Sequence, residues 1–130
     1  MMNKTIPRLP DAELEVMKVI WKEPSPISTS QIKEVLDRIK EWNVSTLQTL
    51  LNRLIQRKFL HTYKEGKYRY YTILITEEEY LAVENKSFFE KVNSKSILKM
   101  VNSLYETNSI TDEDLMELER FIAKKKGEIK

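Results

Sequence analysis

A run of short hydrogen-bonding side chains occupies residues 45–57, with two arginines among them. At 100° per residue, Ser45, Thr49 and Asn52 share one face of a helix, and the leucines of the segment share the opposite face. Exposed helix faces ordinarily carry Glu, Lys and Arg, which are better helix formers than Ser, Thr or Asn. Amide and hydroxyl groups can hydrogen-bond to base edges in the major groove. The spacing therefore predicts a helix whose outward face reads DNA.

The predicted DNA-binding residues comprise this polar face, the two arginines beside it and three basic residues further along the chain. They are Ser45, Thr46, Gln48, Thr49, Asn52, Arg53, Arg57, Lys64, Lys67 and Arg69. Gln pairs well with N6 and N7 of adenine, and the threonine methyl can contact the thymine methyl. The basic residues are expected to contact phosphates, which position the protein on the duplex. A neutral, solvated helix face is the alternative interpretation of the polar set.

Basic charge is concentrated around the same segment. The net charge is only +2, but residues 1–75 hold 13 Lys and Arg against 8 Asp and Glu, whereas residues 76–130 hold 9 against 12. Within residues 42–75 there are 6 basic residues and one acid, Glu65. This local excess is what a face that binds a polyanion needs, although an ordinary solvated surface could also carry it.

Three helices are expected before the basic segment ends. Apolar residues recur at helical spacing from Asp11 to Glu23, and two prolines then stop the first helix. Ser28 with Gln31 forms a capping box for a second helix, and Asn43 is a plausible N-cap for the third, polar helix. Trp21 and Trp42 are interpreted as core or hinge residues of this helical unit.

A β-hairpin follows the third helix. Residues 59–64 and 67–75 are rich in aromatic and β-branched residues, and Glu65-Gly66 between them predicts a tight turn. The tyrosines at positions 68, 70 and 71 are expected to pack the hairpin onto the helices, with stacking on bases as the alternative. His61 has no metal-ligating or catalytic partner nearby in the sequence, so a structural role is favoured.

Three further helices are predicted, opening near Thr76, Lys95 and Thr111. They are too short, and too apolar on one face, to be stable alone, so that face is expected to pack against a second copy of the chain. The predicted dimerisation residues are Leu81, Phe88, Val92, Ile97, Leu98, Val101, Leu104, Tyr105, Leu115, Leu118, Phe121 and Ile122. The fold class is thus mainly α with a small β-hairpin: a winged helix-turn-helix domain over residues 1–75 and a helical dimerisation region over 76–130.

The composition argues against an enzyme. The chain has no Cys, a single His and two Gly, so it cannot supply a thiol nucleophile, a Cys- or His-rich metal site or a glycine-rich phosphate loop. We expect no cofactor and no metal. With no membrane span and no signal segment, we expect a cytoplasmic protein that does not insert into a membrane. A winged-helix module that binds proteins rather than DNA is the competing hypothesis, which would require an apolar or acidic outward face on the third helix.

Two segments carry a family resemblance. Residues 9–21 follow the pattern Leu-x-x-Ala-Glu-Leu-Glu-Val-Met-x-Val-Ile-Trp, and residues 42–54 follow Trp-x-x-x-Thr-Leu-x-Thr-Leu-Leu-x-Arg-Leu. These patterns, followed by Lys-Phe-Leu at 58–60 and the Gly66 hairpin, closely resemble the penicillinase and methicillin-resistance repressors of the BlaI/MecI type. The resemblance is specific over residues 9–75 and rests on helix order over 76–125. Copper-responsive CopY-type repressors share the N-terminal pattern.

The resemblance implies a cytoplasmic homodimeric repressor on a pseudo-palindromic double-stranded DNA operator, controlling a β-lactam-resistance or other stress-response gene. It implies DNA contact by Thr46, Thr49 and Arg53, whereas Ser45 and Gln48 stand where the family often has basic residues. Penicillinase repressors are inactivated by a membrane sensor protease that cuts an Asn–Phe bond. The nearest counterpart here is Asn102, Ser103 and Leu104. Because the chain has no Cys, copper sensing through a cysteine-rich tail is excluded.

Overall fold

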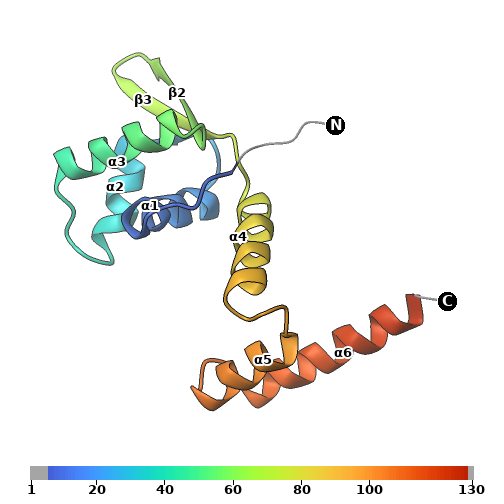
Figure 1. The fold of residues 1–130 in the computed structure, drawn as a ribbon. Helices are drawn as coiled ribbons and strands as arrows, with labels where there is room; N and C mark the ends of the chain where they lie inside the picture. Colours follow the sequence, from blue (N-terminus) through green and yellow to red (C-terminus); the bar gives the residue numbers. More distant parts are fainter. Residues whose placement is uncertain (1–5, 129–130) are drawn as a thin grey trace. The chain divides into compact units, whose positions relative to one another are not determined.

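The computed structural model describes residues 6–128, which form six α-helices and a small antiparallel sheet in the order α1, β1, α2, α3, β2, β3, α4, α5, α6 (Figure 1). Of the described residues, those from Ile6 to Glu84 form one compact unit, and those from Asn85 to Glu128 form a second. The elements are α1 (Asp11–Lys22), β1 (Ile27–Ser28), α2 (Thr29–Asp37), α3 (Val44–Gln56), β2 (Leu60–Glu65), β3 (Tyr68–Ile73), α4 (Glu77–Lys91), α5 (Ile97–Glu106) and α6 (Asp112–Glu128). The predicted fold class, mainly α with a small β-hairpin, is confirmed.

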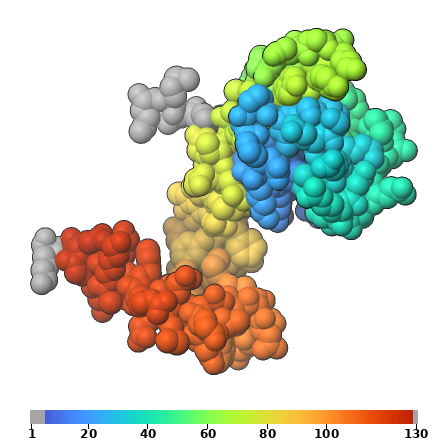
Figure 2. Space-filling view, turned by 180° about the vertical axis from the view of Figure 1, so that it is seen from behind, coloured from blue at the N-terminus to red at the C-terminus, as the bar shows by residue number. Residues whose placement is uncertain are grey.

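The core of the first unit lies among α1, α2, α3 and the sheet. Figure 2 shows α1 in blue beside α2 in cyan, with the hairpin in yellow-green at the edge of the same unit. The helices contribute apolar side chains that are almost wholly buried: Val16, Met17, Ile20, Ile32, Leu36, Leu47, Leu51 and Leu54. Burial of one such side chain stabilises the fold by about 1.5–3 kcal/mol.

A short strand that the sequence did not indicate completes the sheet. The strand order is β1-β3-β2, and Ile27 and Ser28 of β1 pair antiparallel with Tyr71 and Tyr70 of β3. Ser28 also caps α2: its hydroxyl accepts from the Gln31 amide at 3.2 Å, and the Gln31 side chain accepts from the Ser28 amide at 2.8 Å. The predicted capping box is confirmed, and the same residue anchors α2 to the sheet.

The hairpin turn lies one residue later than predicted. Strand β2 ends at Glu65 and strand β3 begins at Tyr68. The two loop residues are therefore Gly66 and Lys67 rather than Glu65 and Gly66. Gly66 has a φ of +61°. A positive φ at the first loop position is typical of the two-residue turns that match strand twist, and glycine adopts it without steric cost.

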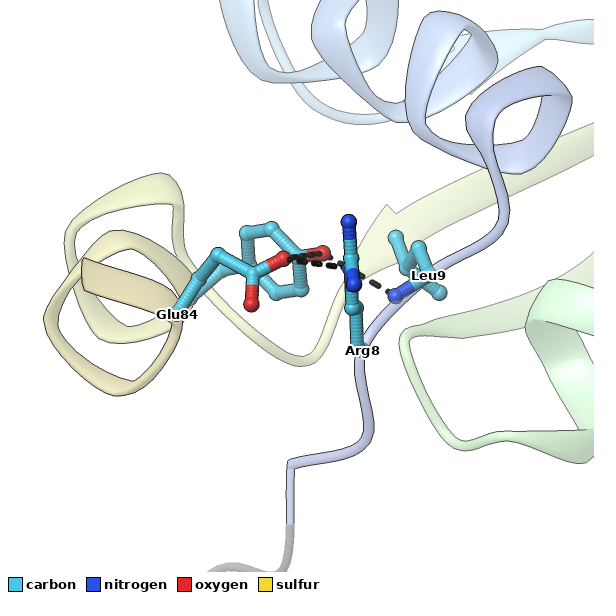
Figure 3. A network of polar contacts seen from close by, with 4 residues as sticks. Arg8, Leu9 and Glu84 are labelled. Carbon is cyan, nitrogen blue, oxygen red and sulfur yellow. Dashed lines mark hydrogen bonds and ion pairs between the residues drawn. The ribbon is translucent and has the colours of Figure 1, made fainter. Parts of the chain in front are cut away.

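The first unit extends past residue 75 because Tyr80 belongs to its core. The Tyr80 hydroxyl accepts from the Leu9 amide at 3.0 Å and donates to the Glu84 carboxylate at 3.3 Å, and Glu84 pairs with the Arg8 guanidinium at 3.2 Å (Figure 3). Burial raises the pKa of Tyr80, and the neighbouring Glu84 carboxylate acts in the same direction. The first turns of α4 are thus fastened to residues 8–9, and the unit runs to Glu84.

Lys58, which follows the C-cap residue Arg57 of α3, has a backbone conformation that favours glycine. Its φ is +65°, and the following Phe59 amide donates to the Leu54 carbonyl at 2.9 Å, as in a Schellman cap. We expect Lys58→Gly to raise the free energy of unfolding by about 0.5–1 kcal/mol, because glycine adopts this conformation without a Cβ clash. Urea unfolding followed by tryptophan fluorescence measures the change. The same substitution at Lys18, inside α1, should lower stability by about 1 kcal/mol; a stabilised Lys18→Gly would contradict this reason.

The second unit contains the remainder of α4 and helices α5 and α6. Ser96 caps α5 and Thr111 caps α6, each through a hydroxyl that accepts a backbone amide three residues later. The Tyr105 hydroxyl donates to Asp112 at 2.9 Å, which links α5 to the start of α6. The charged run at Lys124, Lys125 and Lys126 does not end the helix, and α6 continues through Glu128.

Candidate nucleic-acid interface

Helix α3 separates an apolar face from a polar one. Four leucines are buried on the inner face: Leu47, Leu50, Leu51 and Leu54. On the outer face Ser45, Thr46, Thr49, Asn52 and Arg53 are exposed, and Gln48 is half-buried. The leucines fix the rotation of the helix about its own axis, because each must enter the core. The polar residues that the sequence singled out are therefore brought together on one surface.

The start of α3 is held by side-chain hydrogen bonds. The Asn43 side-chain carbonyl accepts from the Ser45 amide at 2.8 Å and from the Thr46 amide at 3.4 Å. Trp42 is buried just before it, and its backbone amide donates to the Asp37 carboxylate at 3.1 Å. The predicted cap is confirmed, and Trp42, interpreted from the sequence as a core or hinge residue, belongs to the core. Together the cap and Trp42 determine where the polar face begins.

Asp37 closes the turn between α2 and α3. Its carboxylate accepts from the Lys33 ammonium at 2.7 Å as well as from Trp42. Lys33 holds the pKa of Asp37 below its ordinary value, and the Trp42 amide acts in the same direction. The charged form is therefore stabilised in the fold. This contribution is fully present above about pH 4 and is lost as the pH falls through the lowered pKa.

Arg53, within α3, and Arg57, the C-cap residue of that helix, have different environments. Arg53 is exposed on the same side as Asn52. Arg57 instead donates through Nε to the Glu13 carboxylate at 2.7 Å, and Glu13 is only 1% exposed. Sequence reasoning missed this pair because the residues are 44 positions apart. Phosphate contact by Arg57 stays a prediction, whereas its contact with α1 is observed.

The hairpin carries the remaining basic residues near its tip. Lys64, Lys67 and Arg69 are all exposed, and Lys64 lies directly opposite Arg69 in the strand register. The Arg69 guanidinium donates to the Thr62 hydroxyl at 3.3 Å. The Lys67 ammonium lies 5.4 Å from the centre of the Tyr68 ring. We call these three residues the basic tip; their ammonium and guanidinium groups can reach an anion beside the hairpin.

The tyrosines of the hairpin divide among three environments. Tyr71 is fully buried, as predicted. Tyr70 is half-buried and stacks on Tyr63 with ring centres 5.6 Å apart. Tyr68 was expected to pack on the helices, but it is 50% exposed, because it is the strand residue next to the turn.

His61 lies exposed on β2 opposite Thr72. Among residues 6–128, no group of His, Asp or Glu side chains is arranged to hold a metal ion. No helix in this part of the chain is both long enough and apolar enough to cross a membrane.

The predicted dimerisation residues of α4, α5 and α6 are left largely uncovered in the single chain. Val101 and Leu115 are partly buried, and the other ten predicted residues are exposed. Helices α5 and α6 contain no buried residue. Asn102, Ser103 and Leu104 lie on α5 and are exposed. Leu81 belongs to the first unit, and the other eleven residues belong to the second. Exposed apolar patches are typical of interaction sites.

Three helices followed by a two-stranded hairpin, with a polar third helix, define a winged helix-turn-helix protein. The family model described as penicillinase repressor matches residues 9–124. The chain therefore belongs to the penicillinase repressor family, which is a family of transcriptional repressors and not of enzymes.

Relatives of known function cover nearly the whole chain. The chain is 37% identical to the penicillinase repressor of Bacillus licheniformis over 124 residues, covering 95% of this chain and 96% of the relative. It is 30% identical to the methicillin resistance regulatory protein MecI of Staphylococcus aureus over 123 residues, covering 95% and 98%. Both alignments include the helices of the second unit.

Solved structures similar to the chain cover more than half of it. The DNA-binding domain of the repressor BlaI has a TM-score of 0.52 and 46% identity, and covers 60% of this chain and 94% of that one. Monomeric Bacillus licheniformis BlaI, solved in complex with the blaP half-operator, has a TM-score of 0.50 and 46% identity, with coverages of 58% and 92%.

Proposed function

We propose that this chain is a sequence-specific transcriptional repressor that binds a pseudo-palindromic DNA operator as a homodimer. The observation that carries the proposal is the outward face of α3, where amide and hydroxyl side chains are exposed beside Arg53. Such side chains match the donors and acceptors of the major groove. The competing module that binds proteins would need an apolar or acidic face there, and this face is neither.

The basic tip supports phosphate contact beside the groove. In a winged helix the third helix enters the major groove while the hairpin contacts the neighbouring backbone or minor groove. Lys64, Lys67 and Arg69 would supply the positive charge for that contact. Phosphate contacts position the domain, and the polar residues of α3 then select the sequence.

A homodimer is supported by the exposed apolar side chains of the second unit, which need a covering surface. Two copies related by a twofold axis would cover equivalent faces with each other. Their two α3 helices would then enter successive major grooves about 34–36 Å apart. The operator is expected to be pseudo-palindromic for the same reason.

The regulated process and its control are also part of the proposal. The relatives are named for penicillinase and methicillin resistance, which favours a β-lactam-resistance or other stress-response gene as the regulated gene. The proposed location of the repressor is the cytoplasm. A membrane sensor protease could relieve repression by cutting near Asn102, Ser103 and Leu104. In support, these residues are exposed on a ten-residue helix that buries none of its side chains. Such a helix opens locally at low cost, as proteolysis requires.

Selection of duplexes from a random pool, followed by a salt titration in a mobility-shift assay, tests the function. We expect a recovered palindrome and a log–log slope of binding against salt of about −5 to −9, for roughly 3–5 phosphate contacts per protomer. Arg53→Ala should weaken binding to every duplex and reduce the slope by about 1 per protomer. A slope near zero, or no enriched sequence, would refute the function.

A further inference from the structure

Two amide side chains on the outward face of α3 are joined to each other. The Gln48 amide nitrogen Nε2 donates to the Asn52 side-chain carbonyl Oδ1 at 3.3 Å. The residues are four positions apart, so one lies directly above the other on the same face of the helix. Gln48 is half-buried and Asn52 is exposed. The contact lies within the surface proposed to enter the groove.

This contact divides the hydrogen-bonding groups of the pair unequally. A side-chain amide has two N–H donors and a carbonyl acceptor. Gln48 uses one N–H on Asn52 and keeps its second N–H and its carbonyl oxygen. These two groups are what a bidentate contact with adenine N7 and N6 requires. Asn52 has its carbonyl engaged and keeps its two N–H donors.

The neighbouring hydroxyl groups are already committed as donors. The Ser45 hydroxyl donates to the Asn43 side-chain carbonyl at 2.5 Å, and the Thr49 hydroxyl donates to the Ser45 backbone carbonyl at 3.0 Å. In this arrangement Ser45 offers oxygen lone pairs, and Thr49 offers lone pairs and a methyl group. Gln48 is therefore the side chain here that retains both a donor and an acceptor while its orientation is held by a neighbour.

We propose that Asn52 is a positioning residue for Gln48, and that the pair together selects one adenine in each half of the operator. Asn52 holds the Gln48 amide group in a single orientation before DNA arrives. Side-chain ordering is otherwise a cost of binding, and pre-ordering removes part of it. The inference rests on the proposed DNA-binding function. It adds that the base recognised is adenine and that Gln48 and Asn52 recognise it together.

Base-preference profiles of the full-length protein test this inference. Duplexes recovered from the random pool by the wild-type protein are varied one base pair at a time, and relative affinities are measured. We expect a preference for adenine at one position per half-site of about 10-fold to 100-fold, which Gln48→Ala abolishes. Asn52→Ala should reduce the preference at that same position by about 3-fold to 10-fold.

A conservative variant separates positioning from direct contact. Asn52→Asp keeps an oxygen acceptor for the Gln48 N–H but loses the N–H donors of residue 52, so the adenine preference at the Gln48 position should persist. Overall affinity should fall because a carboxylate then approaches phosphates. Adding Asn52→Ala to Gln48→Ala should cause no further loss at that position, since the coupling acts through Gln48.

Gln56→Ala is the matched control, because Gln56 is exposed one turn beyond Asn52. It should leave the profile at the Gln48 position unchanged, and circular dichroism should show equal helix content in all variants. An adenine preference that is undiminished in Asn52→Ala, or that falls equally in Asn52→Ala and Asn52→Asp, would overturn the inference. Absence of any base preference in the wild-type protein would instead overturn the proposed function itself.

Discussion

Replacement of Arg57 by alanine is expected to lower the free energy of unfolding by about 2–4 kcal/mol. The physical reason is the Glu13 carboxylate, which is 1% exposed and accepts from Arg57 Nε at 2.7 Å. Removal of one partner of a buried ion pair leaves an uncompensated charge that costs about 3–5 kcal/mol. The expected loss is somewhat smaller because the Arg57 side chain is 36% exposed, which lets water reach the site.

Urea unfolding followed by tryptophan fluorescence measures this loss directly in the first unit, since both Trp21 and Trp42 lie there. Arg53→Ala, one turn earlier on the exposed face of α3, is the matched control and should change stability by less than about 0.5 kcal/mol. The double variant Glu13→Met, Arg57→Leu should be more stable than Arg57→Ala, because no buried charge remains. Equal losses in Arg57→Ala and Arg53→Ala would show that the ion pair contributes nothing.

Neutralising the basic tip is expected to weaken operator binding about 100-fold per protomer near 0.15 M salt. Lys64, Lys67 and Arg69 are exposed, and each would contact one phosphate in the proposed complex. Each lost contact removes about 0.9 from the log–log salt slope, and three such contacts correspond to about two orders of magnitude in affinity at this salt concentration. The triple glutamine variant should therefore bind weakly and with a slope reduced by about 3 per protomer.

The control for the basic tip carries the same change in charge at exposed lysines of the second unit. The control variant has glutamine in place of Lys99, Lys124 and Lys126, which are exposed. It should bind the operator less than tenfold more weakly than the wild-type protein, because these residues would make no phosphate contact. Both triple variants should melt near the wild-type temperature, as expected for exposed positions. Comparable losses in the two variants would assign the effect to total charge and would remove the hairpin from the interface.

The sequence by itself determined the local elements, the polar face and the family. Capping pairs such as Ser28 with Gln31 lie three residues apart, and their geometry depends on the backbone of one helical turn. The leucines of α3 likewise specify its inner face, because helical periodicity puts them on one side. The contact between Gln48 and Asn52 also has local spacing, so the sequence could have indicated it.

Only the tertiary structure decided which distant side chains meet. Glu13 pairs with Arg57 across 44 positions, and Leu9 donates to Tyr80 across 71. Strand β1 forms because the chain before α2 passes along the free edge of β3, and two residues carry too little pattern to predict it. The first unit likewise ends at Glu84 because of contacts between residues far apart in the sequence. Such contacts depend on how helices and strands pack against one another in three dimensions. The periodicity of a single sequence predicts which face of each helix or strand is buried, but not which other element covers that face.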